Sequence, residues 1–318
     1  MKAKECLREA QLTPYTTTLT TVAARHGVSV SFIHSAPDWP IFELSKGGRR
    51  IRCFNALTDE VGAATFHLLN NKQACHAWLS QMKIHVPRQM RYDTARHAEA
   101  VAFLKEHAPI VVKPCMQWGG RGVAMGVRTP KELKDAVSRA RRYEPDVILE
   151  ETVSGDDLRV ILVDGFVVAA ICRTPASVVG DGEHTVQQLI ALKNAKRRKI
   201  DPSNIIPWDA ETRNNLRELG IKPSWVPPQG QRIRVRLTNN YHTGGDVEMV
   251  SRIPVRAQRI AEQIADDLQI PLVAVDFLVD RETKHMHVIE VSPDMAISPP
   301  EGETVAEAFM EALFPEGE

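Results

Sequence analysis

The chain has 318 residues, of which 43% are hydrophobic and 25% are charged, a composition typical of one large or two medium globular domains. Basic and acidic residues balance at 40 each, so no bulk charge indicates nucleic acid or a membrane surface as a partner. No apolar run approaches the roughly 18 residues that cross a bilayer, and the first residues lack the apolar core of a signal peptide. The five cysteines lack a CxxC spacing. Together these features predict that the protein is found in a reducing cytoplasm.

Residues 1–70 are predicted to form a small N-terminal α/β portion. Residues 4–10 are interpreted as a short helix, and apolar positions recur with a helical period over residues 16–24. The alternating stretch 28–33 predicts a strand, and residues 42–54 predict a hairpin with a glycine turn. This portion indicates no chemistry by itself.

Two helices are predicted next, over residues 63–69 and 72–82, and Asn71 is expected to cap the second. Lys72 then stands in a first helical turn, where the helix dipole favours anions over cations. Either an anion binds nearby or the lysine is simply exposed to solvent. On these residues alone we prefer solvent exposure.

The most informative stretch runs from residue 110 to residue 170. A β-branched run predicts a buried strand that ends in Lys113, and an ammonium group suits phosphate oxygens. A glycine cluster follows, whose backbone can adopt positive φ and can bind an anion through successive N–H groups. Its residues are Gly119, Gly120, Arg121 and Gly122. The loop does not match the P-loop pattern GxxxxGK[ST], and a hairpin turn with an exposed lysine is an alternative of comparable weight.

The following elements are a helix capped by Thr129, a buried strand over 147–150 and a two-stranded ribbon over 158–171. A further helix is predicted from about Thr185, and it ends in the basic run 193–199. Such a run usually marks a solvated helix end, so contact with nucleic acid is a remote alternative.

Residues 200–230 are polar and rich in proline, which indicates a lid or a connector. A strictly alternating strand is predicted over 232–237, with its arginines on one face, where they either solvate the sheet or line an anionic site. A second glycine loop lies at 243–246, and an amphipathic helix is predicted over 255–268.

Two final strands each place a carboxylate within an apolar run. Asp276 lies in the strand 272–277, and Glu290 lies in the strand 287–292. Burying a carboxylate is costly unless it is paired or bound to a metal. The two groups favour a site for a hard cation with oxygen ligands, and structural salt bridges are the alternative.

Together these motifs resemble the ATP-grasp fold, and within it the ATP-grasp domain of cyanophycin synthetases, over residues 40–315. The segments that carry the resemblance are Val111-Val112-Lys113-Pro114 with Gly120-Arg121-Gly122-Val123, Val147-Ile148-Leu149-Glu150 with Gly155-Asp156-Asp157 and Arg159, Thr174-Pro175-Ala176 with His184-Thr185, Asn240 with Thr243-Gly244-Gly245, and Glu290-Val291 with Pro300-Glu301-Gly302-Glu303 and Leu313-Phe314-Pro315. It implies an α+β fold in which two α/β lobes clamp ATP. The ATP-grasp domain would span 71–318, with a central nucleotide-binding lobe at 109–170 and a C-terminal lobe with the metal site at 171–318.

The resemblance also implies roles for individual residues. The phosphates would meet the two lysines and the glycine loop, the adenine would meet the strand end, and the ribose would lie near the aspartate that follows. These cofactor-binding residues are Lys72, Lys113, Gly119, Gly120, Arg121, Gly122, Glu150, Glu151, Val153 and Asp157. Asp276, Glu290 and Ser292 would hold Mg²⁺, or Mn²⁺ in its place. Arg236 and Asn240 would stabilise the transferred phosphoryl group and an acyl-phosphate.

The implied reaction is ATP-dependent formation of an amide bond between a carboxylate and an amine, with an acyl-phosphate intermediate and release of ADP. Such a reaction needs charge neutralisation and positioning more than a protein nucleophile. The expected substrates are amino acids or a short peptide. We expect neither nucleic acid nor a membrane as a partner, and the oligomeric state stays open, with a homodimer as one alternative.

Two departures from the resemblance qualify this expectation. Ser292 stands where the family usually has asparagine, which motivates the alternative of a catalytically altered, ATP-binding regulatory or partner protein on the same fold. A full cyanophycin synthetase also carries a Mur-ligase-like domain and a longer N-terminal region, which are not found here. We therefore expect a stand-alone ligase that makes one type of amide bond.

Overall fold

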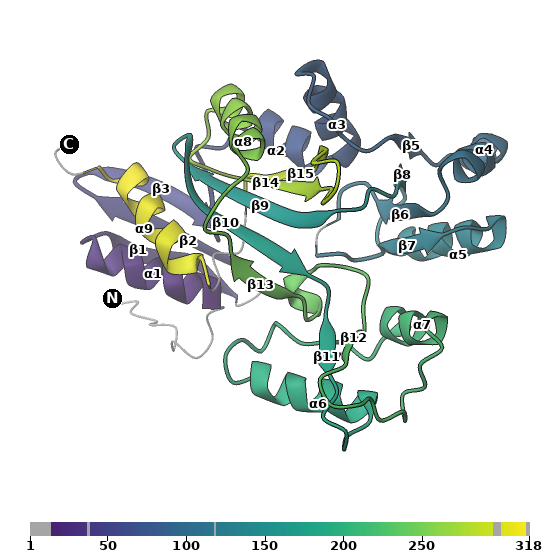
Figure 1. Cartoon of the computed structure of the whole chain (residues 1–318). Helices are drawn as coiled ribbons and strands as arrows, with labels where there is room; N and C mark the ends of the chain where they lie inside the picture. The colour runs from purple at the N-terminus through teal and green to yellow at the C-terminus, as the bar shows by residue number, and fades with distance from the viewer. Residues whose placement is uncertain (1–13, 37–38, 118, 295–299, 316–318) are drawn as a thin grey trace.

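The computed structural model describes residues 14–36, 39–117, 119–294 and 300–315 (Figure 1). Within these ranges the strands form four sheets, in the orders β1-β2-β3-β4, β5-β8-β6-β7, β13-β10-β9-β14-β15 and β11-β12. We name the first three the N-terminal sheet, the small sheet and the large sheet, and residues 175–245 the insert. In the described part of the chain, no helix is both long and apolar enough to cross a membrane.

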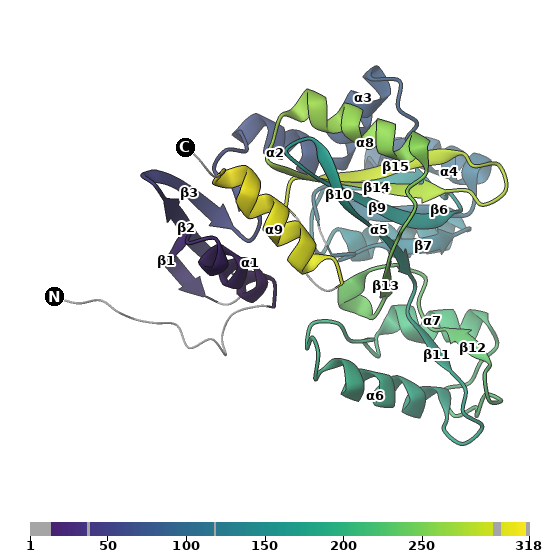
Figure 2. The same ribbon diagram turned by 60° about the vertical axis from the view of Figure 1, so that its left-hand side comes forward.

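The N-terminal sheet confirms the predicted helix, strand and hairpin of this region. Its elements are α1 (Pro14–Arg25), β1 (Ser29–Ala36), β2 (Trp39–Lys46), β3 (Arg49–Phe54) and β4 (Leu57–Thr58). Phe42 on β2 and Leu19 on α1 share one core with Phe309 on the C-terminal helix α9 (Gly302–Leu313). Figures 1 and 2 both show α9 beside α1. The helix predicted over residues 4–10 lies outside the described residues.

The large sheet is buried on both faces. Its strands are β9 (Asp156–Val163), β10 (Phe166–Thr174), β13 (Asp246–Met249), β14 (Leu272–Val279) and β15 (Met286–Ser292). Because side chains alternate along a strand, Ile161 faces the core shared with α9 and the N-terminal sheet. Leu162 faces the opposite core, which contains α8 (Val255–Leu268), α2 (Ala63–Asn70) and α3 (Lys72–Gln81).

These cores correct two predicted boundaries. The ribbon formed by β9 and β10, which we placed in a central lobe at 109–170, belongs to the large sheet. The two strands of the ribbon are apolar on both faces. Both faces are buried only where the strands lie between two packed layers, as they do in the large sheet. The N-terminal portion likewise ends before residue 70, because Leu69 of α2 packs in the same core as α3.

The small sheet has its own core and carries the glycine loop between two of its strands. Its elements are β5 (Gln89–Arg91), α4 (His97–His107), β6 (Ile110–Pro114), β7 (Ala124–Val127), α5 (Pro130–Ala140) and β8 (Val147–Glu151). The predicted Thr129 cap is confirmed, since its side chain and that of Glu132 form a capping box at the start of α5. Figure 1 shows α4 and α5 beside this sheet; α4 and β5 were not anticipated.

The insert forms a separate layer below the large sheet in Figure 1. Its elements are β11 (Ser177–Val179), α6 (Val186–Arg197), α7 (Ala210–Glu218), β12 (Arg232–Arg234) and the 3-10 turn η3 (Tyr241–Thr243). The helix predicted from about Thr185 is confirmed as α6, and Thr185 caps it. The connector predicted over 200–230 contains α7, which begins at its Asp209 cap and buries Leu216.

The prediction of an arginine-lined strand over 232–237 is wrong. The strand ends at Arg234, and the arginines do not share one environment. Arg232 and Arg234 are exposed, whereas Arg236 is only 3% exposed. The carboxylates of Asp209 and Glu211 pair with Arg236 and so account for its burial.

Candidate active site

Lys113 and Glu150 form a buried ion pair between two strands of the small sheet. Lys113 Nζ donates a 2.7 Å hydrogen bond to Glu150 Oε1, and the two side chains are 11% and 7% exposed. The other carboxylate oxygen accepts a 2.6 Å hydrogen bond from Gln89 Nε2. Burial alone would raise the pKa of Glu150. The charge of Lys113, the charge that His76 carries when it is protonated at acidic pH, and the hydrogen bonds from Lys113 and Gln89 together outweigh burial and hold that pKa below its usual value.

Lys72 links Gln117, two residues before the glycine loop, to the last strand of the large sheet. Asn71 caps α3 as predicted, because its Oδ1 accepts two 3.1 Å hydrogen bonds from the backbone of the first turn. Lys72 Nζ donates a 2.8 Å hydrogen bond to the carbonyl oxygen of Gln117 and lies 3.8 Å from Glu290 Oε1. The lysine side chain is only 12% exposed, so our preferred interpretation of simple solvent exposure is wrong.

The glycine loop has the backbone conformation that its sequence suggested. Gly119, Gly120 and Gly122 have φ values of +67°, +72° and +74°. A Cβ at Gly122 would lie 2.9 Å from the Pro114 ring, so this position needs glycine for space as well as for φ. A Cβ at Gly120 would lie 3.6 Å from Asn240 Nδ2, which brings the insert against the loop.

Asp276 and Glu290 lie directly opposite one another on β14 and β15. Side chains paired in this way have Cβ atoms about 4.5–5.5 Å apart. Ser292 pairs with Ala274 two residues further along the same ladder, so its side chain lies on the same face. The structure thus brings together the three residues that were assigned to a metal.

Two arginines hold Asp276 in place. Arg159, directly opposite on β9, donates two hydrogen bonds of 2.6 and 2.9 Å to its carboxylate, and Arg173 Nη2 donates one of 2.8 Å. Burial would raise the pKa of Asp276, but these two cations hold it well below the usual range. The salt-bridge alternative for Asp276 is therefore realised in this structure, and its metal-binding role stays a prediction.

Asp157 extends this network toward the insert. Arg173 Nε donates a 2.8 Å hydrogen bond to Asp157 Oδ1, and Asn239 Nδ2 donates one of 3.1 Å to Oδ2. Burial is the largest influence on this carboxyl group, and it raises the pKa of Asp157. Sequence reasoning missed Arg173. The signal was available, because an arginine inside an apolar strand needs a carboxylate partner just as Asp276 needs a cation.

The donor atoms around Asp276 fit a hard divalent cation that also takes ligands from phosphate and water. Asp276 accepts three N–H donors and keeps room for one more partner among its roughly four acceptor positions. Ser292 Oγ donates to the carbonyl oxygen of Asp294, which leaves its lone pairs free. In the described ranges no group of three or more His, Cys, Asp or Glu side chains is placed to hold a metal, so the protein would supply few of the ligands.

The remaining predicted residues lie at the edges of this arrangement. Arg236 Nη1 donates hydrogen bonds of 2.7 Å to Asp209 Oδ1 and 2.9 Å to Thr212 Oγ1, within the insert. Asn240 caps η3, and its Oδ1 accepts a 2.7 Å hydrogen bond from the backbone N–H of His242. The two predicted catalytic residues therefore lie in different surroundings. Asn240 approaches the glycine loop, whereas Arg236 is paired with two carboxylates of the insert. Three further residues were predicted to bind the nucleotide. Arg121 is exposed in the glycine loop, Glu151 lies at the end of β8, and Val153 follows that strand.

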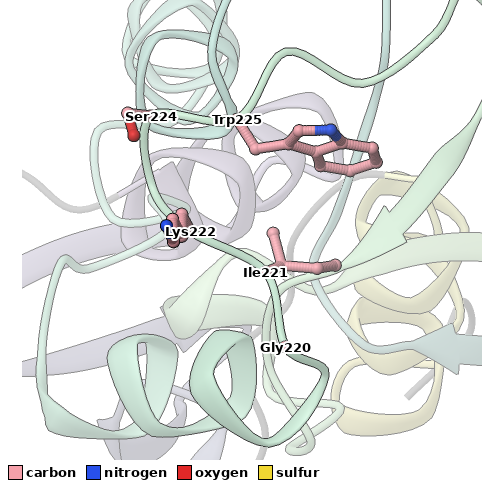
Figure 3. A pocket seen from close by; sticks show the side chains of 5 residues that line it. All are labelled: Gly220, Ile221, Lys222, Ser224 and Trp225. Carbon is pink, nitrogen blue, oxygen red and sulfur yellow. The ribbon is translucent and has the colours of Figure 1, made fainter.

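A cavity of about 350 Å³ lies elsewhere, in the insert (Figure 3). It is lined by Gly220, Ile221, Lys222, Ser224 and Trp225. None of these is a predicted site residue, and the side chains in Figure 3 offer no cluster of charges. The chemistry expected of this chain therefore does not lie in this cavity.

Comparison with known sequences agrees with this geometry. The family described as "D-ala D-ala ligase C-terminus" matches residues 79–194. The cyanophycin synthetase of Nostoc sp. (strain PCC 7120) is 27% identical over 98% of this chain and 36% of its own length. A glutathione biosynthesis bifunctional protein of Streptococcus thermophilus is 27% identical over 77% of this chain and 35% of its own length. The chain thus spans about a third of the length of these relatives.

Solved structures share the fold. A bifunctional glutathione synthetase from Pasteurella multocida superposes with a TM-score of 0.63 at 21% identity, over 96% of this chain and 44% of that protein. A D-alanine–D-alanine ligase from Bacillus anthracis superposes with a TM-score of 0.51 at 14% identity, over 77% of this chain and 67% of that one. The chain therefore has the α+β ATP-grasp fold and is a homologue of the cyanophycin synthetases and the bifunctional glutathione biosynthesis proteins.

Proposed function

We propose that this protein is an ATP- and Mg²⁺-dependent carboxylate–amine ligase that forms an amide bond through an acyl-phosphate and releases ADP. The observation that carries the proposal is that Lys72, within an ATP-grasp fold, contacts both Gln117, two residues before the glycine loop, and Glu290 of the Asp276–Glu290 pair. The names of the similar proteins point the same way, since they include a synthetase and a D-alanine–D-alanine ligase.

Nucleotide binding falls to residues of the small sheet and of α3. Lys72 and Lys113 would place two ammonium groups at the phosphates, and the N–H groups of the glycine loop would add neutral donors. Lys113 is held by Glu150 at 2.7 Å, so its position is set before any nucleotide arrives. The end of β8, from Glu150 to Val153, would face the adenine, and Asp157 would lie near the ribose.

Asp276, Glu290 and Ser292 would hold Mg²⁺, which supplies charge neutralisation at the triphosphate when it is bound. Arg159 and Arg173 keep Asp276 ionised, so its carboxylate is available as an acceptor at neutral pH. Lys72, 3.8 Å from Glu290, would place its charge between the metal site and the loop.

The reaction proceeds in two displacements. An oxygen of the substrate carboxylate attacks the γ-phosphorus, the bond to the bridging oxygen breaks, and ADP leaves. The neutral amine then attacks the carbonyl carbon of the acyl-phosphate, inorganic phosphate leaves, and the amine loses a proton. Asn240 would donate to the transferred group from the insert side of the loop, a role supported by its approach to Gly120. The guanidinium of Arg236 would serve the same purpose only after releasing Asp209 or Glu211.

The substrates proposed are amino acids or a short peptide. Mass spectrometry and an ADP-coupled assay, run on a panel of amino acids and dipeptides with ATP and Mg²⁺, test the proposal. ADP and phosphate should appear only when both a carboxylate and an amine are present, and chelation of Mg²⁺ should abolish them. Formation of AMP, or no product in the whole panel, would contradict it. An ATP-binding regulatory protein, the alternative suggested by Ser292, is not favoured because the named relatives are enzymes.

A further inference from the structure

The segment that leads into η3 carries two asparagines that face the proposed reaction centre. Asn240 approaches the glycine loop, because a Cβ at Gly120 would lie 3.6 Å from its Nδ2 atom. Asn239 Nδ2 donates a 3.1 Å hydrogen bond to Asp157 Oδ2 on the large sheet. Residues 235–240, all of them described by the structure, belong to neither a helix nor a strand. The positions of the two asparagines therefore depend on the side chains that hold this segment.

Glu211, in the first turn of α7, holds the segment through its carboxylate. Its Oε1 atom accepts hydrogen bonds of 3.2 and 3.1 Å from the backbone N–H groups of Leu237 and Thr238, and one of 3.0 Å from the Thr238 hydroxyl. Its Oε2 atom accepts a hydrogen bond from Arg236 Nη2. Donors from three consecutive residues thus converge on one side chain, which fixes the path of the backbone immediately before Asn239.

Arg236 ties the same segment to the start of α7. It is only 3% exposed, and its Nη1 atom donates hydrogen bonds of 2.7 Å to Asp209 Oδ1 and 2.9 Å to Thr212 Oγ1. Asp209 is the cap of α7, since its Oδ1 atom also accepts a 3.1 Å hydrogen bond from the backbone N–H of Thr212. Separating a buried charge from its partners is costly, so these pairs keep the carboxylate of Glu211 beside the segment.

The far end of the segment is fixed by backbone contacts. The carbonyl oxygen of Asn240 accepts hydrogen bonds of 3.2 and 3.0 Å from the N–H groups of Thr243 and Gly245. The Oδ1 atom of Asn240 is occupied by the N–H of His242, so the Nδ2 group is the part of this amide that faces the glycine loop. Both ends of the segment are therefore held, and Glu211 supplies the hydrogen bonds at the first end.

We infer that Glu211 is a positioning residue for phosphoryl transfer, which acts through the segment 236–240 on the amide groups of Asn239 and Asn240. This inference rests on the proposed ligase function and adds to it a residue that works through its neighbours. Donors that stabilise a transferring group are effective when they are held in place before the reaction. Without Glu211 the segment has to reach that position in each turnover, which lowers kcat. The two lysines assigned to the phosphates lie on other elements and keep their places.

Kinetics separate this role from a contribution to folding alone. Glu211→Ala removes every hydrogen bond to the segment, whereas Glu211→Gln keeps an acceptor for the two backbone N–H groups and removes the charge. The assay uses Mg²⁺, ATP and substrates that give ADP in the panel, with rates divided by the nucleotide-binding sites present. Glu211→Ala should lower kcat about tenfold or more at an unchanged KM for ATP, and Glu211→Gln should recover part of that loss. Glu218→Ala, at an exposed carboxylate at the end of the same helix, is the matched control and should keep the wild-type kcat.

A double-mutant cycle tests whether Glu211 acts through the asparagines. In the background Asn239→Ala/Asn240→Ala, the further change Glu211→Ala should alter kcat by less than about twofold, because the groups that Glu211 positions are already gone. An equal loss in both backgrounds would overturn the inference. An unchanged kcat in the single variant Glu211→Ala would overturn it as well.

Hydrogen exchange measures the positioning itself and needs no turnover. In the ligand-free full chain, amide exchange over residues 236–245 should accelerate about tenfold or more in Glu211→Ala, since the N–H groups of Leu237 and Thr238 lose their acceptor. Glu218→Ala should exchange at the wild-type rate. Exchange in Glu211→Ala that is as slow as in the wild type would contradict the inference.

The outcome is separable from that of the proposed function. ADP formation in the substrate panel together with unchanged exchange in Glu211→Ala would refute only the role of Glu211. Faster exchange in that variant, without ADP formation by the wild type, would refute the ligase and retain Glu211 as the residue that holds Asn239 and Asn240.

Discussion

Lys113→Met tests how much stability is lost when Glu150 stays buried without the charge of Lys113. The substitution keeps most of the apolar stem and removes the ammonium, leaving Glu150, whose side chain is 7% exposed, with the 2.6 Å hydrogen bond from Gln89. His76 compensates little at neutral pH, because burial lowers the pKa of its ring and keeps it uncharged. Removing one partner of a buried ion pair costs about 3–5 kcal/mol, so the free energy of unfolding of Lys113→Met should fall by about that amount at pH 7.

The double variant Lys113→Met/Glu150→Gln is the matched control. With both charges gone, no uncompensated carboxylate stays buried, so the double variant should recover to within about 1 kcal/mol of the wild type. Urea unfolding followed by circular dichroism measures all three proteins. A double variant that is as unstable as Lys113→Met would refute the reasoning, because the loss would then come from packing and not from charge.

The same comparison has a defined pH dependence. In the wild type the pKa of Glu150 lies below the ordinary 4.5, so the pair contributes stability above that pH and the contribution is lost as the pH falls through the folded-state pKa. In Lys113→Met burial is no longer opposed by the lysine, so the pKa of Glu150 should rise and the variant should lose stability as the pH rises above about 4.5. The difference between the two proteins should therefore grow from about pH 4 to about pH 8, and a constant difference would contradict the assignment.

Three further predictions concern the glycine loop, the cap of α3 and the buried carboxyl group of Glu301. Gly122 and Gly126 share a φ of +74°, but only a Cβ at position 122 would lie within 2.9 Å of another side chain. In thermal melts, Gly126→Ala should therefore lower the free energy of unfolding by about 1 kcal/mol, and Gly122→Ala should lower it by about 1–3 kcal/mol more. Equal losses in the two variants would exclude the packing explanation. Asn71→Ala should cost about 1 kcal/mol in urea unfolding because α3 loses its cap, whereas Asn71→Asp should keep most of it, and an unaffected alanine variant would contradict the role of the cap. Burial raises the pKa of Glu301 from 4.5 to about 7, so its carboxyl group costs stability as the pH rises between those values. Glu301→Gln should therefore stabilise the protein by up to about 3 kcal/mol above pH 7 and by little near pH 4. A gain that is the same at both pH values would argue against a buried charge.

The sequence alone was sufficient for the features that depend on near neighbours. The caps at Asn71 and Thr129, the helix start near Thr185, the strand that contains Lys113 and the positive φ of the glycine loop all follow from residues within a few positions of one another. Such features are local, because a cap or an alternating strand is defined by spacing along the chain. For the same reason the sequence failed at α7, whose short helical pattern is surrounded by prolines.

Only the tertiary structure decided which charges meet. The pairing of Asp276 with Arg159 and Arg173, the capture of Arg236 inside the insert and the contact of Tyr15 with Ser203 join residues that spacing along the chain does not relate. A buried carboxylate needs a partner, but its sequence neighbourhood does not say which one. The register of the large sheet and the packing of the insert make that choice, because they determine which side chains share a region from which water is excluded.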